Sequence, residues 1–243
     1  MKVKEYLIDR MMERTVHMTL IDPAKQDPGT AGRMASAAQD AGTDAIMVGG
    51  STNVNQENLD ATVLGIKAVT RMPVIYFPSG AHAISRHSDA IYFMSMLNSR
   101  EVRNVIGEQV AGAPVVRKLG LEPISMGYLI VEPGMKVGEV GRADLVPRNR
   151  PDVAVAYGLA AQYLGMDFLY LEAGSGAPEP VPPEMISAVR AEVDIPVIVG
   201  GGIRTPEDAA SVKAAGASAV VTGTVVENGD FEIRLTRIIR ALR

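Results

Sequence analysis

The chain of 243 residues contains no cysteine and no tryptophan, and aromatic residues make up only 5% of it. The absence of cysteine excludes disulfides and cysteine-based zinc sites. No apolar run reaches the ~18 residues that a membrane-spanning helix needs, and the opening segment, MKVKEYLIDRMMERT, has no apolar core of a signal peptide. The net charge of −4 argues mildly against a nucleic-acid-binding protein, which usually carries a basic patch. An intracellular location is compatible with these absences.

What the sequence does contain is an alternation of short β-branched runs and alanine-rich amphipathic stretches. The β-branched runs are apolar on both faces, which is typical of a parallel sheet covered on both sides. They predict eight strands, over residues 16–21, 45–48, 74–77, 90–96, 124–131, 168–171, 196–199 and 219–222. Such an alternation admits a closed barrel or an open doubly wound sheet. Eight regular units favour an α/β fold of the TIM (β/α)8 barrel type, as one domain over residues 1–243.

Helical patterns fill most of the intervals between these strands. They cover residues 29–41, 56–70, 100–117, 152–164, 183–193, 206–215 and 230–242. Two intervals break the pattern. Residues 78–89 are too few for a full crossover helix and both of its loops, so a short or irregular segment is predicted there. Residues 132–150, rich in glycine and charge, are predicted to form a long loop before the next helix.

Glycine and polar residues gather after the predicted strands, at the end of a TIM barrel that carries the active site. Three of these loops are glycine-rich and follow adjacent strands: Gly174-Ser175-Gly176, Gly200-Gly201-Gly202 and Gly223-Thr224. Glycines let the backbone approach an anion closely, and amides at the start of a helix point toward it. A phosphate site is therefore favoured over the alternative, that the glycines only make tight turns. The triple glycine lacks the spacing of a dinucleotide-binding fingerprint.

Two carboxylates stand at the same end of the predicted barrel. Asp22 directly follows the first strand, and with the Ser51 hydroxyl it would form the sparse protein ligand set that is typical of Mg²⁺. The alternative for Asp22 is an N-cap. Glu172 directly follows the sixth strand and can accept hydrogen bonds from a polyol or remove a hydroxyl proton. The alternative for Glu172 is a salt bridge to Arg204 or another basic group, and Glu132 is a weaker candidate.

Other residues point to no definite chemistry. His17 lies in mid-strand and is predicted to be a core residue, while His82 and His87 fall in the irregular segment, without metal-ligand spacing. Core packing is the simpler interpretation for the strand methionines, although such side chains also line adaptable apolar grooves: Met94, Met96 and Met126. From the residues alone, two further functions stay open. One is another phosphate-barrel enzyme, such as an FMN-dependent oxidoreductase, and the other is a non-catalytic barrel that binds a phosphorylated metabolite.

Taken together, these segments resemble the geranylgeranylglyceryl phosphate synthase family, which is related to the bacterial PcrB-type prenyltransferases. The resemblance runs over nearly the whole chain. The segment from Tyr170 to Ala177 is its most specific part, and the triple glycine alone is weak. The motifs that carry it are Leu20-Ile21-Asp22-Pro23, Val48-Gly49-Gly50-Ser51, Tyr170-Leu171-Glu172-Ala173-Gly174-Ser175-Gly176-Ala177, Val199-Gly200-Gly201-Gly202-Ile203-Arg204 and Gly223-Thr224.

The resemblance implies a Mg²⁺-dependent prenyltransferase that joins sn-glycerol 1-phosphate to geranylgeranyl diphosphate, a C20 donor, through an ether bond. Diphosphate is released, in the first ether-forming step of archaeal membrane lipid synthesis. By matching motifs, Asp22 and Ser51 would hold the metal, and Asp22 and Glu172 would be catalytic. The residues implied to bind glycerol phosphate are Tyr170, Leu171, Glu172, Ala173, Gly174, Ser175, Gly176, Gly201, Gly202, Gly223 and Thr224.

The resemblance also implies a cytoplasmic homo-oligomer, either a hexamer or a dimer, with a transient membrane contact for product release and no nucleic-acid partner. Members of the family replace the helix after the third strand with an irregular segment, which agrees with the short interval over residues 78–89. The tryptophan that limits prenyl length in some members has no counterpart in this chain, so the length of the donor stays open.

Overall fold

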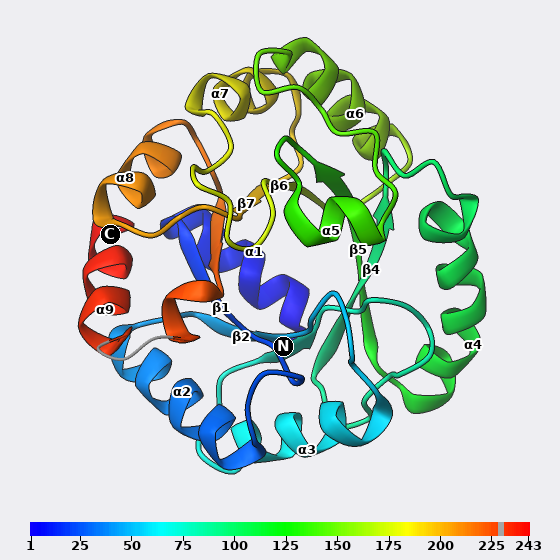
Figure 1. Ribbon diagram of the computed structural model, residues 1–243, viewed down its shortest axis with the longest axis vertical. Coiled ribbons are helices and arrows are strands. Elements are labelled where there is room, and N and C mark those ends of the chain that lie inside the picture. The colour runs from blue at the N-terminus through cyan, green and yellow to red at the C-terminus, as the bar shows by residue number, and fades with distance from the viewer. Residues whose placement is uncertain (228–230) are drawn as a thin grey trace.

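The computed structural model describes residues 1–227 and 231–243, and at its centre eight parallel strands close into a barrel in the order β1 to β8 (Figure 1). The strands are β1 (Val16–Ile21), β2 (Ala45–Val48), β3 (Val74–Tyr76), β4 (Ala90–Met96), β5 (Glu122–Ile130), β6 (Phe168–Glu172), β7 (Val197–Gly200) and β8 (Ala219–Thr222). The predicted TIM barrel is confirmed, and the strand boundaries differ from the predicted ones by one or two residues at most. One of these differences matters for the site, because Glu172 is the last residue of β6 and not the first residue after it.

Helices surround the barrel (Figure 1). They are α2 (Pro28–Ala41), α3 (Gln56–Lys67), α4 (Glu108–Leu119), α6 (Pro151–Tyr163), α7 (Pro183–Glu192), α8 (Pro206–Ala214) and α9 (Phe231–Ala241). The helix predicted over 100–117 instead opens with a π-helical turn, η1 (Arg103–Gly107), before α4, and a short 3-10 turn, η2 (Thr224–Glu227), follows β8. The helix predicted over 230–242 is present from Phe231, and its predicted first residue, Asp230, lies outside the described residues.

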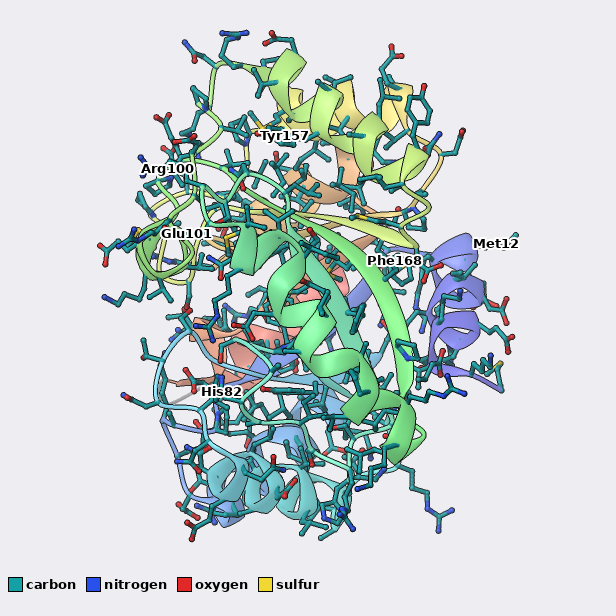
Figure 2. All side chains as sticks on the ribbon, turned by 90° about the vertical axis from the view of Figure 1, so that its right-hand side faces the viewer. Met12, His82, Arg100, Glu101, Tyr157 and Phe168 are labelled. Carbon is teal, nitrogen blue, oxygen red and sulfur yellow. The ribbon has the colours of Figure 1, made fainter. Side chains whose placement is uncertain are left out.

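A further helix, α1 (Val3–Glu13), was not predicted from the sequence. The Glu122 carboxylate, at the start of β5, accepts the amides of Val3 and Lys4 at 2.7 and 3.0 Å. These bonds hold α1 across the amino-terminal end of the barrel (Figure 1). Figure 2 shows Met12 of α1 at one end of the molecule and His82 toward the other. Because α1 covers the amino-terminal end, a site inside the barrel opens at the carboxyl ends of the strands.

The two irregular intervals behave differently. The segment over residues 78–89 contains no helix, as predicted. Side chains from neighbouring helices hold it: Gln56 of α3 bonds both backbone groups of Ile84, at 3.1 and 3.2 Å, and Glu108 of α4 accepts the amide of Ala81 at 2.6 Å. The predicted loop over residues 132–150 was wrong in part, because it contains α5 (Met135–Val140). That helix has only six residues and follows a glycine, so the sequence carries little sign of it, and it is recognised only in the structure.

Side chains on each strand alternate between two apolar cores, because successive residues of a strand point to opposite faces. In β6, Phe168 and Tyr170 belong to the core inside the barrel, and Leu169 and Leu171 belong to the core between the barrel and its helices. This alternation accounts for strands that are apolar on both faces. It also directs Glu172 into the top of the barrel.

Candidate active site

The parallel pairing of β1 with β2 brings Asp22 next to the loop that follows β2. The amide of Gly49 donates to the carbonyl of Ile21 at 3.1 Å, and a Cβ on Gly50 would overlap the Asp22 carboxylate. The carboxylate also accepts the amide of Ala24 at 2.9 Å. Asp22 is half-buried and lies against Gly50. Gly50 and the following Ser51 line the cavity at the carboxyl ends of the strands.

Asp22 and Ser51 fit a Mg²⁺ ion that takes most of its ligands from substrate and water. No cluster of three or more His, Cys, Asp or Glu side chains that could hold a metal occurs in the part of the chain that the structure describes. A metal held by the protein alone therefore finds no cage there. Mg²⁺ is commonly bound through one or two carboxylates together with substrate phosphate oxygens, which is what a single carboxylate beside a hydroxyl provides.

Glu172 is a buried carboxylate with few solvent contacts, being 7% exposed. Its Oε1 accepts the amide of Gly174 at 2.7 Å, and its Oε2 accepts the Tyr128 hydroxyl at 3.2 Å. Burial raises the pKa of Glu172, and the hydrogen bonds from Gly174, Tyr170 and Tyr128 oppose that shift. The carboxyl group is thus held in one orientation and made a stronger base than an exposed glutamate, as a proton acceptor requires.

Four aromatic rings form the floor beneath Glu172. Phe77 is packed against Tyr92, Tyr128 and Tyr170, with ring centroids 6.1, 5.3 and 5.7 Å apart, and Tyr128 meets Tyr170 edge to face at 5.1 Å. Burial, with the neighbouring Glu172 charge, raises the pKa of both Tyr128 and Tyr170 well above its ordinary value. Their hydroxyls therefore stay protonated and act as hydrogen-bond donors toward the carboxylate.

Glycine is required at several positions around Glu172 because neighbouring atoms occupy the space of a side chain. A Cβ on Gly200 would overlap the Tyr170 hydroxyl. Gly201 has a left-handed φ of 81°, and its Cβ would come within 2.5 Å of Glu172 Oε1. Gly174, with φ 99°, lies equally close to the Gly134 carbonyl, where a Cβ would come within 2.7 Å. The glycine loops thus allow the backbone to close directly around the carboxylate.

The loops after β6, β7 and β8 enclose a small cavity of about 50 Å³. Across its mouth the Ser175 and Thr224 hydroxyls lie 3.3 Å apart. The glycines leave backbone amides accessible at such a cavity, and amides and hydroxyls can donate hydrogen bonds to the oxygens of a phosphate group. The cavity is lined by Leu20, Tyr170, Glu172, Ser175, Gly176, Gly201, Gly202, Ile203, Arg204, Val221, Thr222, Gly223 and Thr224.

A second cavity, of about 160 Å³, adjoins the first and is mainly apolar. The two share Leu20, Glu172 and Ser175, so Glu172 stands where they meet. From there the second cavity extends between β4, the segment over 78–89 and α4. Its apolar lining includes Phe77, Ile84, Ile91, Phe93, Met94, Met96, Gly112, Val116, Val137 and Val140, and Ser51 lies at its polar end.

Most of the residues proposed from the sequence thus lie at one place, around the two cavities. Two of them have side chains that point away from the cavities. Leu171 and Ala173 contribute backbone only, because their side chains pack in the outer core. His17 is fully buried, as predicted for a core residue. The salt bridge weighed for Glu172 is not formed, since Arg204 instead donates to the carbonyls of Gly176 and Ala177.

Sequence reasoning missed Tyr128, which lies within β5, and Phe77, which directly follows β3. They carry no local motif. Barrel closure brings the Tyr128 hydroxyl to Glu172 and packs the Phe77 ring against that of Tyr128. The apolar lining from α4 was also missed. Met94 and Met96 were the one available signal, and they line the second cavity while Met126 packs in the barrel core.

Fold and site together define the chain as a TIM barrel with a glycine-lined pocket joined to an apolar cavity at the carboxyl ends of its strands. The model of the PcrB family matches residues 9–242, so the chain belongs to this family of TIM barrels. The resemblance inferred from the motifs is thereby confirmed.

Named relatives agree with this assignment. Geranylgeranylglyceryl phosphate synthase of Methanothermobacter marburgensis is 52% identical over 243 residues, which is 100% of this chain and 99% of the relative. The synthase of Thermoplasma acidophilum, solved in complex with its substrate sn-glycerol-1-phosphate, has a TM-score of 0.97 at 45% identity and covers 100% of this chain and 98% of its own. That of Thermoplasma volcanium has a TM-score of 0.97 at 44% identity, with the same coverage. A flavin enzyme or a non-catalytic barrel finds no support in these relatives.

Proposed function

We propose that this protein is a prenyltransferase that forms the ether bond between sn-glycerol 1-phosphate and geranylgeranyl diphosphate, releasing diphosphate. The observation that carries the proposal is the position of Glu172 where a small glycine-lined cavity meets a longer apolar one. The small cavity suits a phosphate and the apolar one suits an isoprenoid chain. The relatives named geranylgeranylglyceryl phosphate synthase, one of them bound to sn-glycerol-1-phosphate, support this choice of substrates.

In the proposed reaction, the acceptor phosphate lies among Gly176, Gly201, Gly202, Gly223 and Thr224. This position would direct the free glycerol hydroxyl toward Glu172, whose carboxylate takes the hydroxyl proton. The hydroxyl oxygen forms a bond to the allylic carbon as the bond from that carbon to the diphosphate oxygen breaks, and diphosphate leaves with the electron pair. Holding both reactants at one point supplies much of the rate by proximity.

Asp22 and Ser51 would hold Mg²⁺ at the polar end of the apolar cavity, next to the diphosphate. Bound there, the metal supplies positive charge that stabilises the leaving group. The Asp22 carboxylate is positioned for this by Gly50, which leaves room for it, and by the Ala24 amide, which orients one of its oxygens. The buried rings around Phe77 keep water from the allylic carbon, where it would compete with the glycerol hydroxyl.

Product analysis tests the proposal. The purified protein is incubated with Mg²⁺, sn-glycerol 1-phosphate and a mixture of C15, C20 and longer prenyl diphosphates, and the products are identified by mass spectrometry. We expect a prenylglyceryl phosphate ether with C20 preferred, and loss of product when EDTA is added or Asp22→Ala is used. Absence of any prenyl ether contradicts the proposed reaction, and full turnover in EDTA contradicts the metal role of Asp22 and Ser51.

A further inference from the structure

Arg204 connects two of the loops that enclose the small cavity. It lies between the triple glycine after β7 and Thr205, the N-cap of α8. One nitrogen of its guanidinium, Nη2, donates to the carbonyl of Gly176 at 2.6 Å and to that of Ala177 at 2.7 Å. Both carbonyls belong to the loop after β6. The side chain therefore fixes the distance between the loops that follow β6 and β7.

Arg204 also supplies the positive charge at this cavity. Among the residues of the described part of the chain that line it, Arg204 is the one Lys or Arg side chain, and Glu172 is the one carboxylate. The acidic groups nearby have other partners: Asp208 accepts the backbone amides of Arg204 and Thr205 at 2.9 and 3.0 Å, and Glu179 pairs with Arg148 at 3.1 Å. No ion pair of the Arg204 guanidinium occurs within the described residues, so its charge is not neutralised by the protein there.

A phosphate monoester in this cavity faces an electrostatic problem. The ester carries close to two negative charges at neutral pH, and Glu172 adds a third in the same enclosure. Glycine amides and the hydroxyls of Ser175 and Thr224 offer only partial positive charges. A guanidinium provides a full charge and several N–H groups that match paired phosphate oxygens, and Nε and Nη1 of Arg204 make no hydrogen bond to a described residue.

We propose that Arg204 binds the phosphate of the acceptor through its guanidinium, and that the same side chain positions the loop over residues 174–177 around that phosphate. The inference rests on the proposed function for the identity of the substrate, but not for the binding of phosphate itself. Arg204 thereby decides affinity for the phosphorylated acceptor, while the site of the prenyl diphosphate lies on the other side of Glu172 and does not include it.

The test compares wild type with Arg204→Gln, which removes the charge, and Arg204→Lys, which keeps the charge but loses the planar fork. Arg148→Gln is the matched control, because Arg148 lies in the loops at the same end and does not line the cavity. Binding of inorganic phosphate is measured by calorimetry at two salt concentrations, without any turnover. KM for glycerol 1-phosphate, KM for the prenyl diphosphate, kcat and Tm are then measured for each variant.

We expect Arg204→Gln to weaken phosphate binding and raise KM for glycerol 1-phosphate at least tenfold, with KM for the prenyl diphosphate and Tm nearly unchanged. Arg204→Lys should fall between wild type and Arg204→Gln, and Arg148→Gln should match wild type. Unchanged phosphate binding in Arg204→Gln overturns the inference. Equal losses in the Lys and Gln variants, or a matching rise in both KM values, also overturn it, because they indicate loop bracing alone. Phosphate binding that depends on Arg204 without any ether product would instead contradict only the proposed reaction.

Discussion

At the scale of single residues, Glu172 combines burial with a requirement for charge. Placing a carboxylate inside the barrel disfavours its ionised form, and the structure offsets this with hydrogen bonds from Gly174, Tyr170 and Tyr128. The group can therefore accept a proton more readily than an exposed glutamate. The charged carboxylate at this position therefore lowers the stability of the barrel, while the proposed reaction requires it.

Glu172→Gln should abolish most activity while leaving the barrel at least as stable. Loss of a proton acceptor typically lowers kcat by about 10²–10⁴-fold. Because the folded-state pKa is raised, the ionised carboxylate costs stability as pH rises, so the neutral glutamine should not lower Tm at pH 7.5. In wild type, kcat/KM should fall as the pH drops through a range above that of an ordinary glutamate. Near-normal kcat in Glu172→Gln, with an intact circular dichroism spectrum, would contradict the role as base.

Gly201 gives a second prediction at this scale, because it is constrained both by its positive φ and by atoms that lie where a Cβ would be. Comparison with a second glycine separates the two effects. Its left-handed φ costs any alanine roughly 1–2 kcal/mol, and a Cβ would also press on Glu172 Oε1 and the Gly174 amide. Gly165 has a similar φ of 77° but no neighbour within 4 Å of a Cβ, at the opposite end of the barrel. In urea denaturation Gly165→Ala should lose stability through its φ alone, and Gly201→Ala should lose more, because its Cβ also overlaps neighbouring atoms. Only Gly201→Ala should lose activity, by at least about tenfold, and equal activity in the two variants would show that the backbone around Glu172 tolerates displacement.

At the scale of elements, the segment over residues 78–89 and α4 together form the outer wall of the apolar cavity. The segment is irregular, yet it is held by Gln56 from α3 and by Glu108 from α4. A regular helix in this place would occupy the cavity with its own packed face. The missing helix is thus the structural origin of the room for an isoprenoid chain.

Gly112 of α4 tests this view of the wall. A Cβ there would be in van der Waals contact with the segment over residues 78–89, at 3.6 Å from both Ala81 Cβ and Ile84 Cδ1, and all three residues line the cavity. Gly112→Leu should fill the space and shift the preferred donor from C20 toward C15 or shorter, measured as the ratio of kcat/KM values in competition. Ala111→Leu, exposed on the same helix and absent from the cavity lining, is the control and should keep the wild-type ratio. An unchanged ratio in Gly112→Leu would mean that the chain lies elsewhere.

At the scale of the whole molecule, a buried polar cluster joins the first and last strands of the barrel. His17 of β1 is fully buried, with Nδ1 2.7 Å from the Thr43 hydroxyl and Nε2 3.0 Å from the Thr222 hydroxyl of β8. Asp44 accepts the amide of His17 at 3.0 Å and the Arg14 guanidinium at 2.6 Å. The seam where β1 closes the barrel against β8 is therefore held by hydrogen bonds as well as by strand pairing.

This cluster makes stability depend on pH. Burial lowers the pKa of His17 to about 3, so the folded state keeps the ring neutral where the unfolded state, with a pKa near 6.5, takes up a proton. Stability is full above pH 6.5 and falls as the pH drops toward 3, by about 1.4 kcal/mol per unit. Urea denaturation should show a loss of about 2 kcal/mol between pH 6.5 and pH 5. His17→Asn, although less stable at pH 7.5, should show a much smaller loss over that interval, and an equal loss would assign the pH dependence to other groups.

The family resemblance makes two further predictions about the whole molecule. Homo-oligomer formation and a brief membrane contact remain predictions, and size-exclusion chromatography with light scattering measures the first. No helix in the described parts of the chain is both long enough and apolar enough to cross a bilayer.

The sequence by itself determined the alternation of strands and helices, because runs that are apolar on both faces are typical of a parallel sheet covered by helices, and periodicity is a local property. Eight such runs favoured the barrel over an open sheet, and closure of β1 against β8 is seen only in the tertiary structure. It also determined the glycine loops and carboxylates, since each lies at the end of a strand or directly after it. Tertiary structure alone decided which strand-centre residues reach the site. Tyr128 reaches Glu172, and Phe77 packs against Tyr128, only because the barrel closes and brings their strands together. Likewise α1 is held by the Glu122 carboxylate at the start of β5, far away in the chain, which no local pattern encodes.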